Sequence, residues 1–209
     1  MSTALLHLFT ADTPNGQKIS IALEELGLNY LQINVDLANG EQKTPDFLAR
    51  NPNGKIPVLV DHRHANTLFE SAVILAYLAE QNGALGGEGV VDKLVIQQWL
   101  SFQIASVGPM LGQLWWFRHG TTTTNEQALD RYRRESLRLY GVVEGELSKR
   151  DYIAGDSYTI ADIALFTWLR TYEELGLDIA PFPAVRAWLE RLAKRPAVKR
   201  GLAKSRQEA

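Results

Sequence analysis

The sequence predicts a two-domain α+β fold, in which a mixed strand-and-helix domain at residues 1–82 precedes an all-helical domain at residues 91–209. Strand-length and helix-length patterns alternate only in the first of these regions, and helix-length amphipathic segments alone follow it. Between the two regions, residues 83–89 contain four glycines in seven positions. This composition is typical of a linker, which we place at residues 83–90.

The first domain begins with a short apolar strand at residues 5–9 and a helix whose apolar residues recur at helical spacing up to Gly27. Apolar and polar residues then alternate over residues 30–35, which predicts a second strand. The remaining elements are a short helix near 45–50, strands at 57–60 and 66–69, and a helix at 72–81. The resulting order, β-α-β-α-β-β-α, matches a thioredoxin-like domain.

The second domain contains helical patterns at residues 91–117, 126–147, 160–175 and 183–194. The third pattern is preceded by Thr159, with Asp162 three residues further on, which is the spacing of a capping box. An apolar run follows at once, so we expect a buried helix to begin here.

The composition, with 45% hydrophobic and 22% charged residues, is that of a globular protein. No apolar run reaches the roughly 20 residues that a membrane-spanning helix needs. The N-terminus shows no basic segment before an apolar core, so we expect a cytoplasmic protein. The formal net charge of −2 gives no electrostatic reason to expect nucleic acid or an anionic membrane as a partner.

The chain contains no cysteine. No protein thiol can therefore act as nucleophile, redox partner or metal ligand, and any sulfur chemistry must come with the ligand. His62 and His64 form a His-x-His pair in a predicted turn. Because no third ligand lies within sequence reach, we expect no metal site.

Two short motifs indicate a peptide ligand with a free carboxylate. Pro57 follows Ile56 directly before a predicted strand, where a proline is tolerated. If this bond is cis, the backbone of Ile56 turns outward and can pair with an extended ligand. Glu70 and Ser71 stand at the start of the helix at 72–81, where a hydroxyl and backbone amides suit a carboxylate. The alternative for the proline is a purely structural turn.

Together these motifs resemble the glutathione-binding half of glutathione transferases, in which a cis-proline loop precedes a Glu-Ser or Asp-Ser pair. The segments 13–16 (Thr-Pro-Asn-Gly) and 108–113 (Gly-Pro-Met-Leu-Gly-Gln) are most similar to the bacterial nu class and its nitrogen-regulator-like relatives. The resemblance implies glutathione as co-substrate. It also implies a homodimer, with each site in the cleft between the first domain of one subunit and the second domain of the other.

The resemblance implies that Thr13 and Asn15 activate the glutathione thiol. Transferases place a Tyr, Ser or Cys between the first strand and the first helix, and none occurs between Leu5 and Lys18. A tyrosine or cysteine mechanism is therefore not expected. An alternative is that Thr13 only caps the helix, with Pro14 in its first turn. Both roles can hold together.

The resemblance also assigns the remaining glutathione contacts in the first domain. Ile56 and Pro57 would bind the cysteinyl backbone, and Glu70 and Ser71 the γ-glutamyl end. Lys55 would pair with the glycyl carboxylate, unless it is only an exposed loop cation. Gln42 matches a glutathione-contacting glutamine of the nu pattern, although loop glutamines are commonly just solvated.

In the second domain, Arg131 resembles an arginine that reaches the cleft, and a pair with Glu135 one turn away explains it equally well. Trp115, Trp116 and Phe117 could line an apolar pocket for the electrophile or form a buried helix end.

The expected activity is glutathione-dependent disulfide reduction, in which two glutathiones supply both sulfurs and leave as oxidised glutathione. Two alternatives remain open at this stage. One is a transferase that conjugates carbon electrophiles or reduces hydroperoxides, and the other is a non-catalytic regulator that binds glutathione or a partner.

Overall fold

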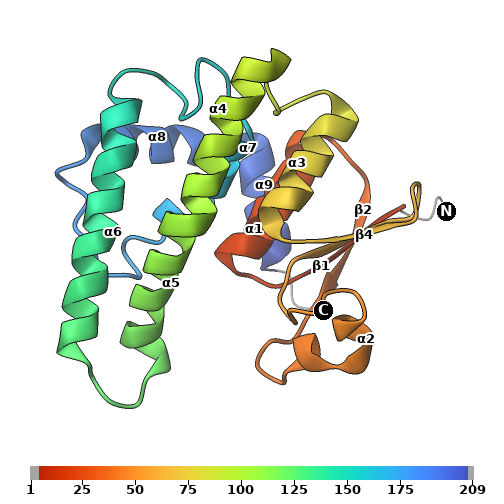
Figure 1. Cartoon of the computed structure of the whole chain (residues 1–209), viewed down its shortest axis with the longest axis horizontal. Helices are drawn as coiled ribbons and strands as arrows, with labels where there is room; N and C mark the ends of the chain where they lie inside the picture. The colour runs from red at the N-terminus through yellow and green to blue at the C-terminus, as the bar shows by residue number, and fades with distance from the viewer. Residues whose placement is uncertain (1–4, 207–209) are drawn as a thin grey trace. The chain divides into compact units, whose positions relative to one another are not determined.

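The computed structural model describes residues 5–206 and divides into two compact units (Figure 1). The first unit contains the residues up to Ala84 together with those from Lys194 onward, and the second spans Leu85–Ala193. A four-stranded mixed sheet with helices forms the first unit, and helices form the second. The predicted α+β fold class is confirmed.

The sheet of the first unit has the strand order β2-β1-β3-β4, with β1 at Leu6–Thr10, β2 at Tyr30–Asn34, β3 at Val58–Asp61 and β4 at Asn66–Phe69. β1 and β2 are parallel because helix α1 (Pro14–Glu25) connects them as a crossover. β3 runs antiparallel to both β1 and β4. The predicted β-α-β-α-β-β-α order is present.

Two sets of helices cover the sheet. α1 packs against α3 (Ser71–Asn82), and both lie on the same side of the sheet in Figure 1. The short α2 (Pro45–Leu48) follows a single 3-10 turn at Glu41–Lys43, and its Phe47 packs with Val35 and Val58. Apolar burial on both faces fixes the sheet as the core of this unit.

The C-terminal helix α9 (Pro196–Ser205) belongs to the first unit, whereas the sequence-based division placed all of 91–209 in the second domain. α9 packs closely on α1: a Cβ at Gly201 would lie 2.7 Å from the backbone of Ile21. Ion pairs join Arg195 to Glu25 and Arg200 to Glu24, each with 2.7 Å between nitrogen and oxygen. Arg195, directly before α9, and Arg200 within it therefore pair with α1.

The second unit contains a nearly continuous helix from α4 (Gly89–Phe102) to α5 (Gly108–Trp115), with π-helical turns at Gln103–Val107 and Trp116–Gly120. The first π turn directly precedes Pro109, which has no N–H to donate. In that turn the Gly108 amide bonds to the Gln103 carbonyl, five residues back. The wider turn therefore accommodates the proline without ending the helix.

The other helices of this unit are α6 (Glu126–Leu147), α7 (Ile160–Leu169) and α8 (Pro183–Ala193). α7 is buried almost throughout and forms the centre of the unit. It ends at Leu169, earlier than the predicted 160–175, and a series of turns follows up to Gly176, whose φ of 60° is left-handed.

The predicted capping box is present at the start of α7. The Asp162 carboxylate accepts hydrogen bonds from the amides of Thr159 and Ile153, both at 3.0 Å, and from the Trp188 indole at 3.1 Å. Asp162 is fully buried. Its burial raises the pKa of its carboxyl group to about 6, although these hydrogen bonds favour the ionised form.

Candidate functional site

Three loops of the first unit meet at one end of its sheet. Phe9, near the end of β1, pairs with Val58, the first residue of β3. Val58 in turn pairs with Phe69, the last residue of β4. The loop before α1, the Ile56-Pro57 turn and the start of α3 therefore emerge side by side, so the pairing of the strands gathers the predicted motifs.

The loop between β1 and α1 carries the proposed thiol-activating residues. Thr13 is the N-cap of α1, with Pro14 at the first helical position, and its Oγ1 accepts from the Gly16 amide at 3.2 Å. The predicted capping role is confirmed. Because that hydrogen bond uses a lone pair of the hydroxyl oxygen, the Thr13 hydrogen can still be donated to a ligand. Asn15 lies half-buried in the first turn of α1.

Asp12 anchors this loop from two sides. Its Oδ1 accepts from Gln17 Nε2 at 2.8 Å and from Ser205 Oγ at 3.0 Å. α9 therefore reaches the loop that carries Thr13. Sequence reasoning missed Asp12 and Ser205, because nearly the whole chain separates them and no local pattern links them.

The Ile56-Pro57 peptide bond is cis. Asn51, buried at 1% exposure, holds the preceding loop: its Nδ2 donates to the Lys55 carbonyl at 2.6 Å and its Oδ1 accepts from the Asn53 amide at 3.0 Å. Ile56 is half-buried and packs on the cluster around Phe47. Asn51 was not among the predicted residues, although a buried asparagine four residues before Lys55 is what fixes this turn.

Glu70 and Ser71 form the start of α3. Glu70 has a left-handed backbone with φ of 69°, which costs a non-glycine residue on the order of 1–3 kcal/mol. Its side chain is exposed and makes no capping hydrogen bond to the helix. Ser71 is the first residue of α3 and is 8% exposed. Strained backbone of this kind is often retained at binding sites, where it orients the adjacent groups.

Beneath Ser71 lies a buried cation that sequence reasoning missed. Lys18 of α1 is 1% exposed, and its Nζ is 3.1 Å from Ser71 Oγ. Burial lowers the pKa of the Lys18 ammonium to about 7, against an opposing effect of the nearby Glu70 charge. In the sequence Lys18 stands out only as the one cation of α1, and its burial beside Gln17 and Ile19 is seen only in the structure.

The other two predicted glutathione-binding residues of the first unit, Lys55 and Gln42, make fewer contacts with the rest of the protein. Lys55 is exposed. Gln42 is half-buried, its Nε2 donates to the Leu37 carbonyl at 3.3 Å, and its Oε1 is buried with no hydrogen-bond partner. Lys43, next to it, reaches the Asn53 carbonyl at 3.4 Å and so places a second cation beside the Lys55 loop.

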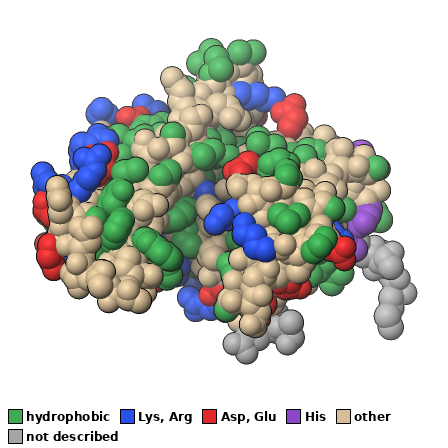
Figure 2. Space-filling view, turned by 60° about the horizontal axis from the view of Figure 1, so that its bottom comes forward, with side chains coloured by type: hydrophobic (Ala, Val, Ile, Leu, Met, Phe, Trp, Pro, Cys, Tyr) green, Lys and Arg blue, Asp and Glu red, His purple; other side chains and the backbone are tan. Residues whose placement is uncertain are grey.

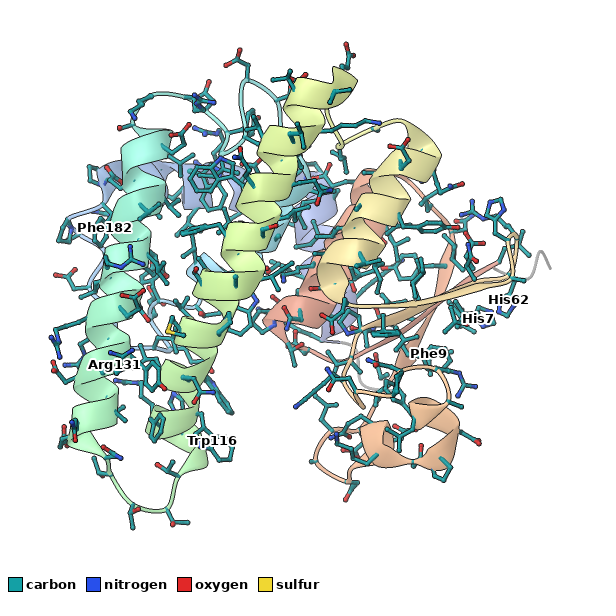
Figure 3. All side chains as sticks on the ribbon, in the orientation of Figure 1. His7, Phe9, His62, Trp116, Arg131 and Phe182 are labelled. Atoms are coloured by element: carbon teal, nitrogen blue, oxygen red, sulfur yellow. The ribbon has the colours of Figure 1, made fainter. Side chains whose placement is uncertain are left out.

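The predicted residues of the second unit lie on α5, its π-helical extension and α6 (Figure 3). Trp115 and Trp116 are 42% and 51% exposed, so a buried helix end is wrong for these two. Phe117 is half-buried and stacks on Tyr132, with ring centroids 5.6 Å apart. Trp115 donates its indole N–H to Glu174 at 2.6 Å.

Arg131 is exposed on α6. Its alternative partner, Glu135, forms its ion pair with Arg138 at 2.7 Å instead. Arg138 is the main cause of the lowered pKa of Glu135, and Arg131 contributes less. A pair with Glu135 therefore does not by itself account for Arg131.

His62 of the His-x-His motif pairs with a histidine of a neighbouring strand. His62 Nε2 lies 3.2 Å from Nδ1 of His7 on β1, and the two rings meet edge to face (Figure 3). Within residues 5–206, no group of three or more His, Asp or Glu side chains could hold a metal ion. Over the same part of the chain, no helix is long and apolar enough to cross a membrane.

The surface carries both charge signs. On the face shown in Figure 2, Lys and Arg side chains are interspersed with Asp and Glu side chains, as the net charge of −2 suggests. Hydrophobic side chains are also exposed there, and the largest exposed apolar side chains of the second unit include Trp115 and Trp116.

Comparisons with known proteins identify the family to which this chain belongs. The family model described as "Glutathione S-transferase, N-terminal domain" matches residues 4–80, and the one described as "Glutathione S-transferase, C-terminal domain" matches residues 102–196. A protein named disulfide-bond oxidoreductase YfcG, from Escherichia coli, is 41% identical over 206 residues, which cover 96% of each chain.

Two solved structures show the same fold. A glutathione transferase family member from Pseudomonas fluorescens with two glutathione bound is 40% identical, with a TM-score of 0.88 over 95% of this chain and 92% of that one. The glutathione transferase URE2P8 from Phanerochaete chrysosporium, with oxidized glutathione, is 34% identical, with a TM-score of 0.92 over 98% and 96% of the two chains. The chain therefore belongs to the glutathione S-transferase family.

Proposed function

We propose that this protein binds glutathione and uses its thiolate to reduce disulfide bonds. The observation that carries the proposal is the gathering of Thr13, the cis Pro57 and Ser71 at one end of the sheet, in a chain without cysteine. Similarity to a protein named disulfide-bond oxidoreductase supports the reaction class. Family members with two glutathione or with oxidized glutathione bound support the proposed substrate and product.

The first task of such a site is to ionise the ligand's thiol, whose pKa is about 8.5 in water. A pKa lowered by about two units makes the thiolate the main form at neutral pH and corresponds to roughly 2.7 kcal/mol. The Thr13 hydroxyl, the Asn15 amide and the N-terminal amides of α1 are hydrogen-bond donors in one place. Donors of this kind stabilise the anion without accepting a proton.

The reaction balances without any protein thiol. The first glutathione thiolate attacks one sulfur of the disulfide, forms a mixed disulfide and releases the other half as a thiolate. A second glutathione thiolate then attacks the glutathione sulfur of that mixed disulfide, which gives oxidised glutathione and releases the remaining thiol. Two glutathione thiols thus supply two electrons, and their protons pass to the two product thiols.

The remaining groups of the first unit would hold the tripeptide. We assign the backbone of Ile56, beside Pro57, to the cysteinyl residue, and Glu70 with Ser71 to the amino and carboxylate groups of the γ-glutamyl end. Lys55 would attract the glycyl carboxylate, and its exposure leaves it accessible for this role. Gln42 is a further contact in this proposal.

In the second unit, we assign Arg131 to an acidic group of the second glutathione or of the product. Trp115, Trp116 and Phe117 would contact the disulfide or electrophile, and the exposure of both tryptophans favours contact with a ligand over a packing role. We place the protein in the nu class and in the cytoplasm, where glutathione is kept reduced.

The reaction is tested by turnover of 2-hydroxyethyl disulfide with glutathione. Asn15→Ala and Thr13→Ala are each expected to lower kcat/KM by about 10- to 100-fold, because each removes a donor to the anion. The pKa of bound glutathione, followed by thiolate absorbance, should rise in both variants. Asn125→Ala is the matched control, since Asn125 caps α6 in the same way but lies in the second unit.

Unchanged rates in both variants would contradict the assigned roles. A strong rate with a chloronitrobenzene and almost none with disulfides would instead identify a conjugating transferase. Normal glutathione binding without turnover on either substrate would identify a non-catalytic binding protein.

We also infer that the protein is a homodimer in which two subunits complete each site. Light scattering of the purified chain should give twice the monomer mass of 23.4 kDa. A monomer at micromolar concentration, with full turnover of the disulfide substrate, is the result that rules this out.

A further inference from the structure

We propose that Lys18 is a positioning residue for glutathione: its buried ammonium donates to Ser71 and turns the Ser71 hydroxyl toward the γ-glutamyl carboxylate. This inference rests on the proposed function, because it assumes that glutathione binds at the start of α3. It assigns a role to a residue on α1 that the ligand itself need not touch.

The direction of one hydrogen bond carries the argument. An ammonium has three donors and no acceptor, so Ser71 Oγ must be the acceptor at its 3.1 Å distance from Lys18 Nζ. The serine hydroxyl has a single hydrogen, which then has to point away from Lys18. A group bound on the far side of Ser71 meets a donor, and a carboxylate is the fitting acceptor.

The position of Ser71 in the helix strengthens this preference. Ser71 is the first residue of α3, where the backbone amides have no acceptor within the helix and the helix dipole favours an anion. The Lys18 charge, one hydrogen bond below, acts in the same direction. The Ser71 hydroxyl, the first backbone amides of α3 and the Lys18 ammonium are thus all hydrogen-bond donors, and an anion can approach them from the side of Ser71 that faces away from Lys18.

The burial of Lys18 shows that the charge is held at a cost. At 1% exposure the ammonium is almost fully removed from water, and this burial lowers the pKa of Lys18 to about 7. A methionine would fill a similar volume without that cost. A carboxylate bound at Ser71 would add a negative charge to that of Glu70 and so favour the charged lysine. Lysine charge and ligand binding therefore support each other.

The same contact ties α1 to the strained turn. Ser71 directly follows Glu70, whose φ is 69°. A hydrogen bond from Lys18 fixes the residue after the turn, and so helps to hold Glu70 in an orientation that exposes its carboxylate to the ligand's amino group.

The test compares two ligands by calorimetry: glutathione, and 4-aminobutyryl-cysteinyl-glycine, which lacks only the γ-glutamyl carboxylate. In the wild type, glutathione should bind about 10- to 100-fold more tightly than the analogue, the range expected for hydrogen bonds to a charged group. Lys18→Met should lose about 10-fold or more in glutathione affinity and bind the analogue as the wild type does. A role in packing alone would not distinguish these ligands.

Ser71→Ala provides the second arm. If Lys18 acts through Ser71, Lys18→Met should cost little further glutathione affinity in the Ser71→Ala background. If Lys18→Met does not fold, Lys18→Gln replaces it. This variant keeps a shorter, neutral donor, and like Lys18→Met it should lose affinity for glutathione and keep the wild-type affinity for the analogue. Equal losses for both ligands, or no loss in any variant, would overturn the inference. Failure of the wild type to bind glutathione at all would instead refute the proposed function.

Discussion

Replacing Asp162 with alanine is expected to lower the free energy of unfolding of the second unit by about 3–5 kcal/mol. The Asp162 carboxylate is the shared acceptor for the amides of Thr159 and Ile153 and for the indole of Trp188. Without it, these buried donors lose their acceptor in a region that water does not reach. The loss falls on the N-terminus of α7, the central helix of the unit.

Tryptophan fluorescence in a guanidinium titration is a clean measurement of this effect. All five tryptophans of the chain lie between residues 99 and 188, within the second unit. Asp156→Ala is the matched control, because Asp156 is exposed in the same loop. Equal midpoints for the two variants would show that the capping network contributes little.

The pH dependence gives the same prediction a second readout. The pKa of Asp162 is about 6 in the folded state, above its ordinary value of 3.8, because desolvation outweighs the hydrogen bonds. The folded state therefore binds this proton more tightly than the unfolded state. The proton-linked part of this group's contribution is fully present below about pH 4 and is lost as the pH rises through about 6, whereas the hydrogen bonds that the carboxylate accepts persist above that pH. Asp162→Ala should remove that slope, and the Asp156→Ala control should keep it.

The fold was largely predictable because its signals are local. The alternation of apolar and polar residues over 30–35 predicts a strand, and apolar residues at helical spacing predict α1. Thr159 and Asp162, three residues apart, predict the start of α7. The assignment of α9 was not predictable in this way. It depends on ion pairs such as that between Arg195 and Glu25, which join residues far apart in the sequence.

The candidate site also contains residues that local sequence patterns predict and residues that only the structure reveals. Thr13, Pro57 and Ser71 each stand at the end of a strand or the start of a helix, where local sequence patterns are informative, and the pairing of the strands brings them together. Lys18 and Asn51 act through buried side chains in the interior. Their patterns on the sequence are those of an ordinary helix and an ordinary loop, so only the tertiary structure shows what they contact.

Lys18→Met is expected to stabilise the first unit at pH 6, by on the order of 3–5 kcal/mol, while it weakens glutathione binding. The pKa of Lys18 is about 7 in the folded state, against an ordinary value of 10.5, with burial as the main cause and Glu70 opposing it. Below pH 7 both states carry the proton, and the folded state bears the full cost of burying it. Between about 7 and 10.5 the unfolded state binds more protons, so the stability of the wild type rises with pH across that window.

Hydrogen exchange of the α1 amides at pH 6 and at pH 9 measures this difference, because the tryptophans do not report on the first unit. Lys18→Met should show slower exchange than the wild type at pH 6, after correction for intrinsic rates, and a clearly smaller difference at pH 9, where the wild type has regained part of its stability. Lys199→Met, which removes an exposed lysine of α9, should leave both values unchanged. If Lys18→Met exchanges as fast as the wild type at pH 6, the buried charge costs nothing.

A gain in stability together with a loss of affinity separates two explanations of this lysine. A lysine that served only the fold would lower stability when removed, and both glutathione and its decarboxylated analogue would then bind less well. A lysine held charged for the ligand costs the free protein stability, and this cost is offset only when a carboxylate arrives above Ser71. The gain in stability and the loss of glutathione affinity have the same structural cause, which is that the buried Lys18 ammonium lies 3.1 Å from the Ser71 hydroxyl at the start of α3.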